Sequence, residues 1–309
     1  MSKILITGAL GFIGRSLIDH LIETKNDFEI FAIDIKEFPE DAEYLKNSIQ
    51  YQKLDIRSYE QVREYFQKYT FDGIVHLAAV SRVKDAEDDK QNCINTNYFG
   101  TKFIIQSAAL NSKTWVIFSS SREVYGEQKV MPVKESAEKT PLNIYGFYKL
   151  EGERLVVKNI NNYFILRFSN VYGNIYDIPD RVIPKFIQNA LANKELVVEG
   201  GGQIIDFTYI SDTVSSISKC IDLLCSEKQF KEDLLILPGF ENKITDLIKI
   251  IENEIGCKLN IRLNDKRNYD VEKFIGDNQK RKSILGNIEF ISLQEGIHKT
   301  LCHLKKVKY

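Results

Sequence analysis

Short apolar segments rich in β-branched residues alternate with longer amphipathic segments through the first half of this chain. Strict strand–helix alternation predicts parallel strands, because each helix returns the chain to the edge of the sheet where the previous strand began. Several apolar segments lack polar alternation, which is typical of a sheet covered by helices on both faces. The sequence therefore predicts an α/β fold built on a doubly wound parallel sheet. The expected strands are Lys3–Thr7, Glu29–Asp34, Ile49–Asp55, Gly73–Leu77, Thr114–Ser119 and Tyr163–Phe168, and the expected helices are Gly11–Lys25, Ser58–Tyr69, Asp89–Asn111 and Leu142–Asn159.

After about Val171 the alternation becomes less regular. We therefore expect residues 1–170 to form a nucleotide-binding domain and residues 171–309 to form a smaller α/β domain, with segments near 204–238 returning to the main sheet. The elements expected in this half are helices at Ile183–Asn193, from Asp212, at Asp246–Ile255, at Asp277–Leu285 and at Leu293–Lys305, and strands at Leu196–Glu199, Ile204–Tyr209 and Leu234–Leu237.

Composition excludes several classes of protein. A net charge of −1 argues against a general nucleic-acid or membrane-surface binder. The five cysteines contain no C-x-x-C pair, so we expect neither a disulfide framework nor a metal site. No apolar run approaches the roughly 18 residues needed to cross a bilayer, and the N-terminus enters a strand at once. These features predict a cytoplasmic protein.

The turn between the first strand and the first helix contains Gly8, Gly11 and Gly14. Glycines at such a turn let the backbone approach a pyrophosphate, and the helix N-terminus supplies amide donors and a positive dipole end. Asp34 ends the second strand, where an acidic side chain accepts hydrogen bonds from both ribose hydroxyls and repels a 2′-phosphate. The sequence therefore predicts a dinucleotide cofactor, NAD rather than NADP, although Lys36 lies close by.

The pattern Tyr-x-x-x-Lys occurs four times, and residues with this spacing share one face of a helix. An ammonium group beside a phenol favours the phenolate, so such a pair is expected to lower the tyrosine pKa. The four pairs are Tyr98/Lys102, Tyr125/Lys129, Tyr145/Lys149 and Tyr269/Lys273. Tyr98 belongs to an earlier helix, Tyr125 to a glycine-containing loop and Tyr269 to the second half of the chain.

Tyr145 and Lys149 have the surroundings that a reactive pair requires. They begin a helix after Pro141, with Asn143 as a plausible cap. The preceding strand ends in Ser119–Ser121, and ligands of open α/β sheets bind at the carboxyl ends of the strands. We therefore expect Tyr145, Lys149 and a serine hydroxyl to handle a proton together.

The glycine spacing here is G-x-x-G-x-x-G, and at this point the chain resembles the extended short-chain dehydrogenase/reductase family. The resemblance covers nearly the whole sequence and is to the nucleotide-sugar epimerase/dehydratase branch, which includes enzymes like UDP-glucose 4-epimerase. It implies a Rossmann-type sheet with a smaller substrate-binding C-terminal domain. The matching blocks are Gly8–Gly14, Asp55-Ile56, His76–Ala79, Asn97-x-x-Gly100-Thr101, Ser119–Gly126, Tyr145-x-x-x-Lys149, Leu166–Gly173, Arg181–Pro184, Asp206–Tyr209, Arg267-x-x-Asp270-Val271 and Leu293-x-Glu295-Gly296.

The resemblance assigns cofactor contacts that spacing alone does not. It implies that Asp55 and Ile56 hold the adenine, that residues 77–79 line the far side of NAD, and that Lys149 holds the nicotinamide ribose. His76 belongs to a buried strand and reads as structural. The cofactor-binding residues that it implies are Gly8, Gly11, Phe12, Ile13, Gly14, Asp34, Ile35, Asp55, Ile56, Leu77, Ala78, Ala79, Asn97, Ser119, Tyr145, Lys149 and Phe168.

The resemblance also implies the catalytic roles. Tyr145 would be the general base for a sugar hydroxyl, and Ser121 would hydrogen-bond the same oxygen. Glu123 stands where decarboxylating and dehydrating relatives carry a glutamate, although an ordinary loop charge is an equally good reading. The implied ligand is a nucleotide-diphosphate sugar, and the substrate-binding residues are Ser81, Ser121, Asn170, Arg181 and Arg267.

Two departures from the family pattern bear on the reaction. Dehydratases of the family carry an Asp-Glu pair where this chain has Arg122-Glu123, so dehydration is disfavoured and 4-epimerisation is the expected reaction. Ile205 replaces an arginine that contacts phosphate in many relatives, which leaves the nucleotide and sugar open. A 4-dehydrogenase, a decarboxylase, a keto-sugar reductase and a non-catalytic NAD-binding sensor remain alternatives. The family commonly forms homodimers through the helices at Asp89–Asn111 and Leu142–Asn159.

Overall fold

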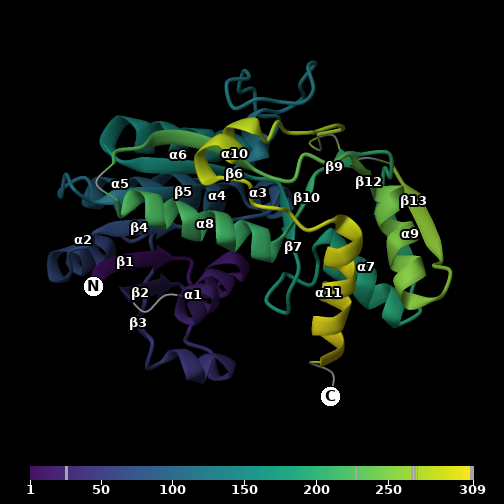
Figure 1. Ribbon diagram of the computed structural model, residues 1–309, viewed down its shortest axis with the longest axis horizontal. Coiled ribbons are helices and arrows are strands. Elements are labelled where there is room, and N and C mark those ends of the chain that lie inside the picture. The colour runs from purple at the N-terminus through teal and green to yellow at the C-terminus, as the bar shows by residue number, and fades with distance from the viewer. Residues whose placement is uncertain (25–26, 227, 266, 268, 270, 307–309) are drawn as a thin grey trace.

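The computed structural model describes residues 1–24, 27–226, 228–265, 267, 269 and 271–306 of the chain. Within these ranges the main sheet has seven strands, and every neighbouring pair is parallel (Figure 1). The predicted doubly wound α/β fold is therefore confirmed. The spatial order of the strands is β11 (Lys231–Ile236), β6 (Tyr163–Phe168), β5 (Trp115–Ser121), β4 (Gly73–His76), β1 (Ser2–Thr7), β2 (Phe28–Asp34) and β3 (Ile49–Lys53).

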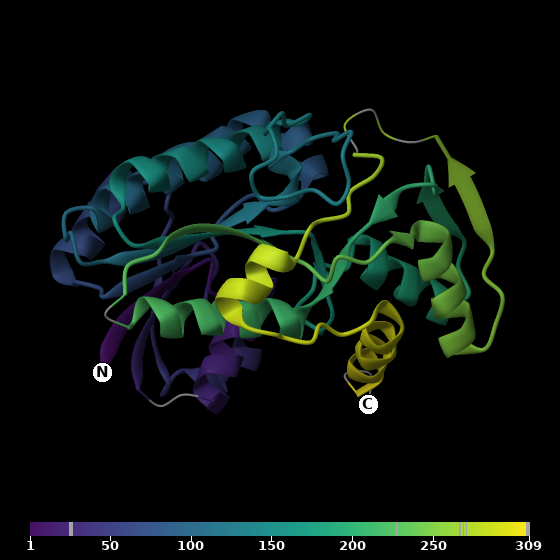
Figure 2. The ribbon, with the colours of Figure 1, turned by 45° about the horizontal axis from the view of Figure 1, so that its top comes forward.

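Helices cover both faces of this sheet (Figure 2). Side chains alternate between the faces along each strand, so Ile4 and Ile6 of β1 join one apolar cluster and Leu5 joins the other. The first cluster includes the apolar faces of α1 (Phe12–Thr24) and α8 (Ile210–Leu224). The second includes those of α2 (Tyr59–Lys68), α5 (Thr101–Ala108) and α6 (Ile144–Asn159).

The remaining elements gather at one side of the sheet, at the right in Figure 1. Among the described residues, three small two-stranded sheets lie in this part of the molecule, and β11 is the one strand after residue 170 that joins the main sheet, beside β6. The elements are β7 (Asn170–Tyr172) with β10 (Phe207–Tyr209), β8 (Leu196–Glu199) with β13 (Ile261–Asn264), β9 (Ile204–Ile205) with β12 (Asn242–Lys243), and helices α7 (Val182–Leu191), α9 (Ile244–Ile255) and α11 (Leu293–Lys306). Helix α10 (Gln279–Leu285) packs against β11.

Two predicted elements are wrong in detail. The expected helix Asp89–Asn111 is α4 (Lys90–Cys93), a π-helical segment (Ile94–Gly100) and α5. The expected strand Ile204–Tyr209 is divided at Asp206, whose buried carboxylate accepts a hydrogen bond from the Gly239 amide at 3.0 Å. Both interruptions depend on tertiary contacts that local periodicity does not reveal. The short helices α3 (Val83–Asp88), η1 (Glu40–Leu45) and η3 (Arg122–Val124) were not expected.

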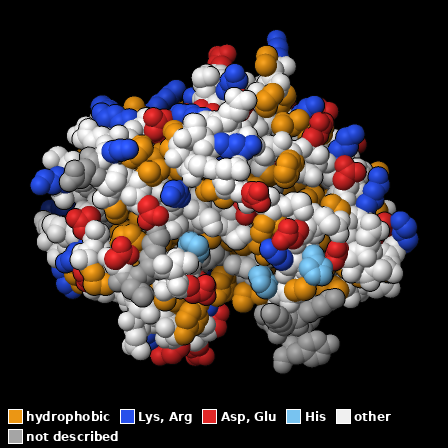
Figure 3. Space-filling view, in the orientation of Figure 1, with side chains coloured by type: hydrophobic (Ala, Val, Ile, Leu, Met, Phe, Trp, Pro, Cys, Tyr) orange, Lys and Arg blue, Asp and Glu red, His pale blue; other side chains and the backbone are white. Residues whose placement is uncertain are grey.

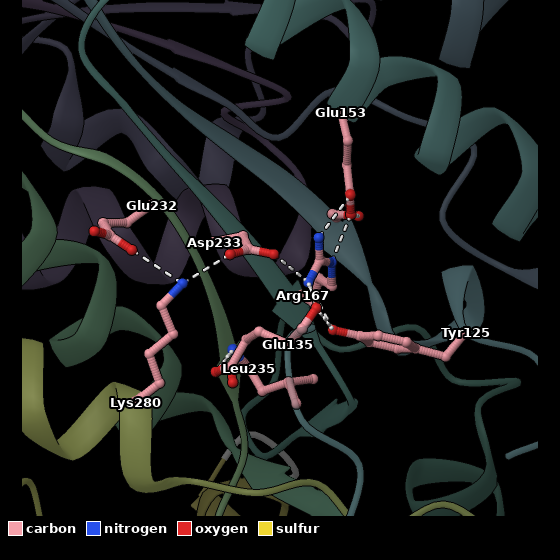
Figure 4. A network of polar contacts seen from close by, with 9 residues as sticks. Tyr125, Glu135, Glu153, Arg167, Glu232, Asp233, Leu235 and Lys280 are labelled. Atoms are coloured by element: carbon pink, nitrogen blue, oxygen red, sulfur yellow. Dashed lines mark hydrogen bonds and ion pairs between the residues drawn. The ribbon is translucent and has the colours of Figure 1, made fainter. Parts of the chain in front are cut away.

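A network of buried charges joins the main sheet to α6 and α10 (Figure 4). At its centre is Arg167 of β6, with only 2% of its side chain exposed. Its Nε and Nη2 atoms donate to the two carboxylate oxygens of Glu153 at 2.8 Å each, and Nη1 lies 2.6 Å from Asp233 Oδ2 and donates to the Tyr125 hydroxyl. Lys280 of α10 donates to Asp233 at 2.8 Å. Glu153 and Asp233 are therefore each paired with a cation, whereas the buried Glu135 carboxylate accepts from the Leu235 amide at 3.0 Å.

The surface carries charges of both signs close together, as the face in Figure 3 shows. This distribution agrees with the net charge of −1. None of the helices in the described part of the chain is both long enough and apolar enough to cross a bilayer.

Candidate active site

Two cavities adjoin at the carboxyl ends of the main strands. The larger has a volume of about 530 Å³ and is lined by the glycine turn and by the ends of β2, β4 and β5. The smaller, of about 410 Å³, lies between these strand ends and the elements after residue 170. The two cavities share six lining residues, so a ligand bound in one cavity would meet a ligand bound in the other beside these residues. The shared residues are Ser81, Ser121, Tyr145, Ser169, Val171 and Arg181.

The glycine turn at one end of the larger cavity leaves no room for side chains. A Cβ atom on Gly14 would lie 2.3 Å from the Gly8 carbonyl oxygen, and one on Gly8 would lie 2.7 Å from the Ala78 amide nitrogen. Gly8 also has a φ angle of 67°, which disfavours other residues. The turn leads into the N-terminus of α1, whose free amides suit a pyrophosphate. These features fit a bound dinucleotide.

Two carboxylates line the same cavity. Asp34 accepts hydrogen bonds from the Leu10 amide at 2.9 Å and the Lys36 amide at 3.1 Å, and its oxygens keep lone pairs for ribose hydroxyls. Asp55 accepts from the Arg57 guanidinium, with the shortest contact at 2.7 Å, and this hydrogen bond lowers the Asp55 pKa. Both carboxylates are therefore fixed by neighbouring groups before any ligand binds.

The structure brings the expected cofactor residues to this cavity with one exception. Asn97 does not line it: its side-chain amide pairs with the Val80 backbone, accepting from the amide at 2.8 Å and donating to the carbonyl at 3.0 Å. Asn97 therefore supports the loop that follows β4, and its direct contact with the cofactor stays a prediction. The residues that do line it are Gly8, Gly11, Phe12, Ile13, Gly14, Asp34, Ile35, Asp55, Ile56, Leu77, Ala78, Ala79, Ser119, Tyr145, Lys149 and Phe168.

Helix α6 carries the reactive pair into the junction of the cavities. Asn143 caps the helix by accepting from the Gly146 amide at 2.8 Å, as expected. The phenol of Tyr145 is buried and hydrogen-bonded to the Ser121 hydroxyl. Lys149 Nζ donates to the Ser119 carbonyl at 2.7 Å and lies 5.9 Å from the centroid of the Tyr145 ring. The structure therefore brings the Tyr145 phenol, the Ser121 hydroxyl and the Lys149 ammonium group together at the carboxyl end of β5.

The expected effect of Lys149 on its partner is not found. Burial raises the pKa of Tyr145 to about 12, and the hydrogen bond from Ser121 opposes this only in part. Burial also lowers the pKa of Lys149 to about 8. The predicted depression of the Tyr145 pKa by Lys149 is thus wrong for this structure, because the low-polarity surroundings disfavour both charges and the ammonium is directed at a backbone carbonyl.

The other Tyr-x-x-x-Lys tyrosines lie outside both cavities. Tyr125 is fully buried beside Arg167, and Tyr98 packs against Phe99 and Tyr148. Tyr269 lies under the guanidinium of Arg267, 5.5 Å from its ring centroid. Tyr145 is thus the one tyrosine of the four that reaches the site.

The smaller cavity presents polar groups suited to an anionic, hydrogen-bonding ligand. Ser81, Asn170, Arg181 and Arg267 line it, as expected. Arg181 Nη1 donates to the Val171 carbonyl at 3.2 Å and to Asp177 at 3.4 Å. Four buried polar atoms of its lining have no hydrogen-bond partner among the described residues: Asn170 Nδ2, the Tyr172 hydroxyl, Asp177 Oδ2 and Gln203 Oε1.

Several lining residues were not anticipated. Arg82, Asp177 and Gln203 of the smaller cavity and Tyr176 of the larger one lie in loops or at element ends, where no periodicity marks them. The sequence offered one indication of such residues, which is closeness to a family motif: Asp177, for example, lies shortly after the block that ends at Gly173.

Glu123 is held in place by two neighbours. Its Oε1 atom lies 3.0 Å from Arg122 Nη2, and its Oε2 atom accepts from Asn143 Nδ2 at 2.9 Å. Arg122 and Glu123 are both buried and both line the smaller cavity. Each carboxylate oxygen of Glu123 therefore already has a partner, Arg122 for Oε1 and Asn143 for Oε2.

His76 lies in β4, below the site, and its surroundings agree with a structural role. The Thr7 hydroxyl accepts from the Ala78 amide at 3.1 Å and is hydrogen-bonded to His76 Nδ1 at 2.7 Å, and His76 Nε2 is hydrogen-bonded to the Thr101 hydroxyl at 3.0 Å. Burial lowers the pKa of His76 to about 3. The imidazole is therefore neutral in the folded protein.

This neutral histidine predicts an acid sensitivity. Below about pH 6.5, His76 takes up a proton in the unfolded chain but stays neutral in the folded protein. The contribution of His76 to folding stability is therefore fully present above pH 6.5 and is lost as the pH falls. We expect the stability advantage of the wild type over His76→Gln to shrink by about 2 kcal/mol between pH 7.5 and pH 5. Urea unfolding at both pH values measures it, with the exposed His298→Gln as control. An advantage that stays constant with pH would contradict the assignment.

Comparisons with known proteins agree with this site. Residues 4–229 match the NAD dependent epimerase/dehydratase family. A putative UDP-glucose 4-epimerase of Methanocaldococcus jannaschii is 29% identical, with 98% of each chain covered. The structure resembles Thermotoga maritima UDP-glucose 4-epimerase with UDP-glucose (27% identity, TM-score 0.89, 99% and 100% covered) and Bacillus cereus UDP-glucuronic acid 4-epimerase with UDP-glucuronic acid and NAD (27%, 0.88, 99% of each). The chain therefore belongs to the NAD dependent epimerase/dehydratase family, and NAD is its cofactor.

Proposed function

We propose that this protein is an NDP-sugar 4-epimerase, which oxidises the sugar C4 hydroxyl to a transient ketone and reduces it from the opposite face. The observation that supports this best is the position of Tyr145 and Ser121, which line both cavities at their junction. A sugar in the smaller cavity would present its hydroxyl to these groups beside a dinucleotide in the larger one. NAD, when bound there, supplies the hydride acceptor and, in its reduced form, the donor.

The residues of the chain would then transfer one proton between the sugar hydroxyl and Tyr145. As the phenolate, Tyr145 accepts the proton of the sugar hydroxyl during oxidation and returns it during reduction. Burial disfavours the phenolate in the cofactor-free protein, and the positive charge of the oxidised nicotinamide, when NAD is bound, would favour it. Ser121, already hydrogen-bonded to the phenol, bridges it to the sugar oxygen. Lys149, fixed on the Ser119 carbonyl, places its positive charge near the oxygen that becomes charged. Asn170, Arg181 and Arg267 would hold the diphosphate and nucleotide.

The pairing of Glu123 supports epimerisation over the alternatives that use a carboxyl group. A dehydratase or decarboxylase that relied on Glu123 would have to use a carboxylate that Arg122 and Asn143 hold by one contact to each oxygen. A 4-dehydrogenase and a keto-sugar reductase use the same Tyr145 chemistry, so they are the competing proposals. A homodimer formed through α5 and α6, and a cytoplasmic location, belong to the same proposal.

A panel of nucleotide sugars tests the reaction. The NAD-loaded protein would be incubated with UDP-, dTDP- and GDP-hexoses and with UDP-uronic acids, and products would be analysed by mass spectrometry and NMR. We expect one class of substrate to return with unchanged mass and inverted C4. A loss of 2 Da with stoichiometric reduced cofactor would identify a dehydrogenase instead. A loss of 44 Da would identify a decarboxylase, and a loss of 18 Da a dehydratase.

A further inference from the structure

Two segments that are distant in sequence, η1 and the loop after β7, both contact Arg15 of α1 beside the larger cavity. Arg15 of α1 donates from Nη1 to Asp41 Oδ2 at 2.9 Å and from Nη2 to the Asp41 carbonyl at 3.0 Å. The same guanidinium lies 4.1 Å from the centroid of the Tyr176 ring, within the range of a cation–π contact. Arg15 is therefore held between η1 and the loop that follows β7.

A second set of contacts joins the same segments. The Tyr44 hydroxyl donates to Asp19 at 2.7 Å and lies 3.2 Å from the Tyr176 hydroxyl. Next to it, Asn174 Nδ2 donates to the Ser16 hydroxyl at 2.8 Å. We name the group Arg15, Asp41, Tyr44 and Tyr176 the Arg15–Tyr176 clasp.

The clasp stands at the edge of the cofactor cavity. Tyr176 and Ile178 line that cavity together with Phe12 and Ile13 of α1, so the loop from β7 covers part of the space next to the glycine turn. Arg15 follows Gly14 directly, and its side chain is only 9% exposed. A dinucleotide leaving past α1 and this loop would require the Tyr176 contacts to separate.

The competing reactions differ in whether the enzyme must release its cofactor after each turnover. An epimerase regenerates NAD within each turnover and has no need to release it. A 4-dehydrogenase leaves NADH after each turnover and must exchange it. A structure that resists exchange therefore suits the redox-neutral reaction.

We propose that the Arg15–Tyr176 clasp retains NAD between turnovers, with Arg15, Tyr44 and Tyr176 as positioning residues that act on the covering loop. The proposal rests on the proposed epimerase function for its purpose and on the contacts above for its mechanism. It separates retention from catalysis, because none of these three side chains belongs to the Ser121–Tyr145–Lys149 group.

Cofactor retention tests the clasp directly. Wild type, Tyr176→Ala and Tyr44→Phe would be loaded with NAD and gel-filtered, and the NAD remaining per chain would be measured after denaturation. Release would then be timed with excess fluorescent etheno-NAD as a trap. We expect Tyr176→Ala to release NAD about tenfold faster than wild type, since it removes both the ring under Arg15 and the hydroxyl beside Tyr44. Tyr44→Phe should give a smaller increase.

The matched control is Tyr59→Ala on α2, which removes a half-exposed ring packed on Phe103 (centroids 5.4 Å apart) outside both cavities. It should release NAD at the wild-type rate. Equal rates of NAD release from Tyr176→Ala and from the wild type would overturn the proposal that the clasp retains NAD. A wild type that retains NAD but leaves C4 uninverted would refute the epimerase proposal while leaving the clasp intact.

Discussion

Replacement of Tyr145 by phenylalanine is expected to lower kcat by about 10²–10⁴-fold, the usual contribution of a positioned general base. The substitution removes only the phenol oxygen, which is the atom that Ser121 contacts at the junction of the cavities. The ring stays buried, so the fold and the cofactor cavity should persist. The measurement is turnover of the substrate identified in the nucleotide-sugar panel, with bound NAD determined on the same sample.

The control is Tyr98→Phe, which belongs to another Tyr-x-x-x-Lys pair and lines neither cavity. It should keep full turnover, because its ring contacts with Phe99 and Tyr148 are unchanged. Full turnover in Tyr145→Phe would refute the assignment of Tyr145 as the base. A loss of bound NAD in that variant would instead show that the phenol serves mainly in cofactor binding.

Substitution of Arg167 by methionine is expected to have the largest effect on stability, a loss of about 3–5 kcal/mol in the free energy of unfolding. The guanidinium pairs with Glu153 and Asp233, and its removal leaves Glu153 buried without a cation (Figure 4). An unpaired carboxylate in such surroundings is costly, because the Ser120 hydroxyl that still donates to Glu153 at 2.5 Å replaces only part of its hydration. Urea unfolding at pH 7 measures the change, provided that one transition is observed.

Arg154→Met is the matched control, since Arg154 also pairs with a glutamate on α6 but its side chain is 65% exposed. It should cost less than about 1 kcal/mol. The double variant Arg167→Met/Glu153→Gln should recover part of the loss, because it removes the charge that Arg167→Met leaves unpaired. Equal effects of Arg167→Met and Arg154→Met would show that the buried network contributes little.

Much of the fold was predictable because the helices of the first half have an amphipathic period and its strands are short apolar segments. Leu17, Ile18 and Leu21, for example, form the stripe that buries α1. The failures lie where a tertiary contact overrides the period. The π-helical segment at Ile94–Gly100 accompanies the pairing of Asn97 with Val80, and the division of β9 from β10 accompanies the buried carboxylate of Asp206.

The site was predictable in its residues but not in its electrostatics. Motif spacing brought Ser121, Tyr145 and Lys149 to one helix and one strand end, where the structure has them. The direction of the Tyr145 pKa shift was wrong, because spacing does not reveal that burial outweighs the neighbouring ammonium. The ion pair of Arg122 with Glu123 was likewise invisible, since adjacent residues in a sequence need not face each other.

The three consecutive serines at the end of β5 each hold a different side chain of α6. The Ser119 carbonyl accepts from Lys149, the Ser120 hydroxyl donates to Glu153, and the Ser121 hydroxyl meets Tyr145. A slip of the helix by one residue along the strand would break all three contacts at once. Mutations that adapt this protein to new sugars would therefore accumulate in the loops around the smaller cavity, while the oxidation machinery tolerates little drift.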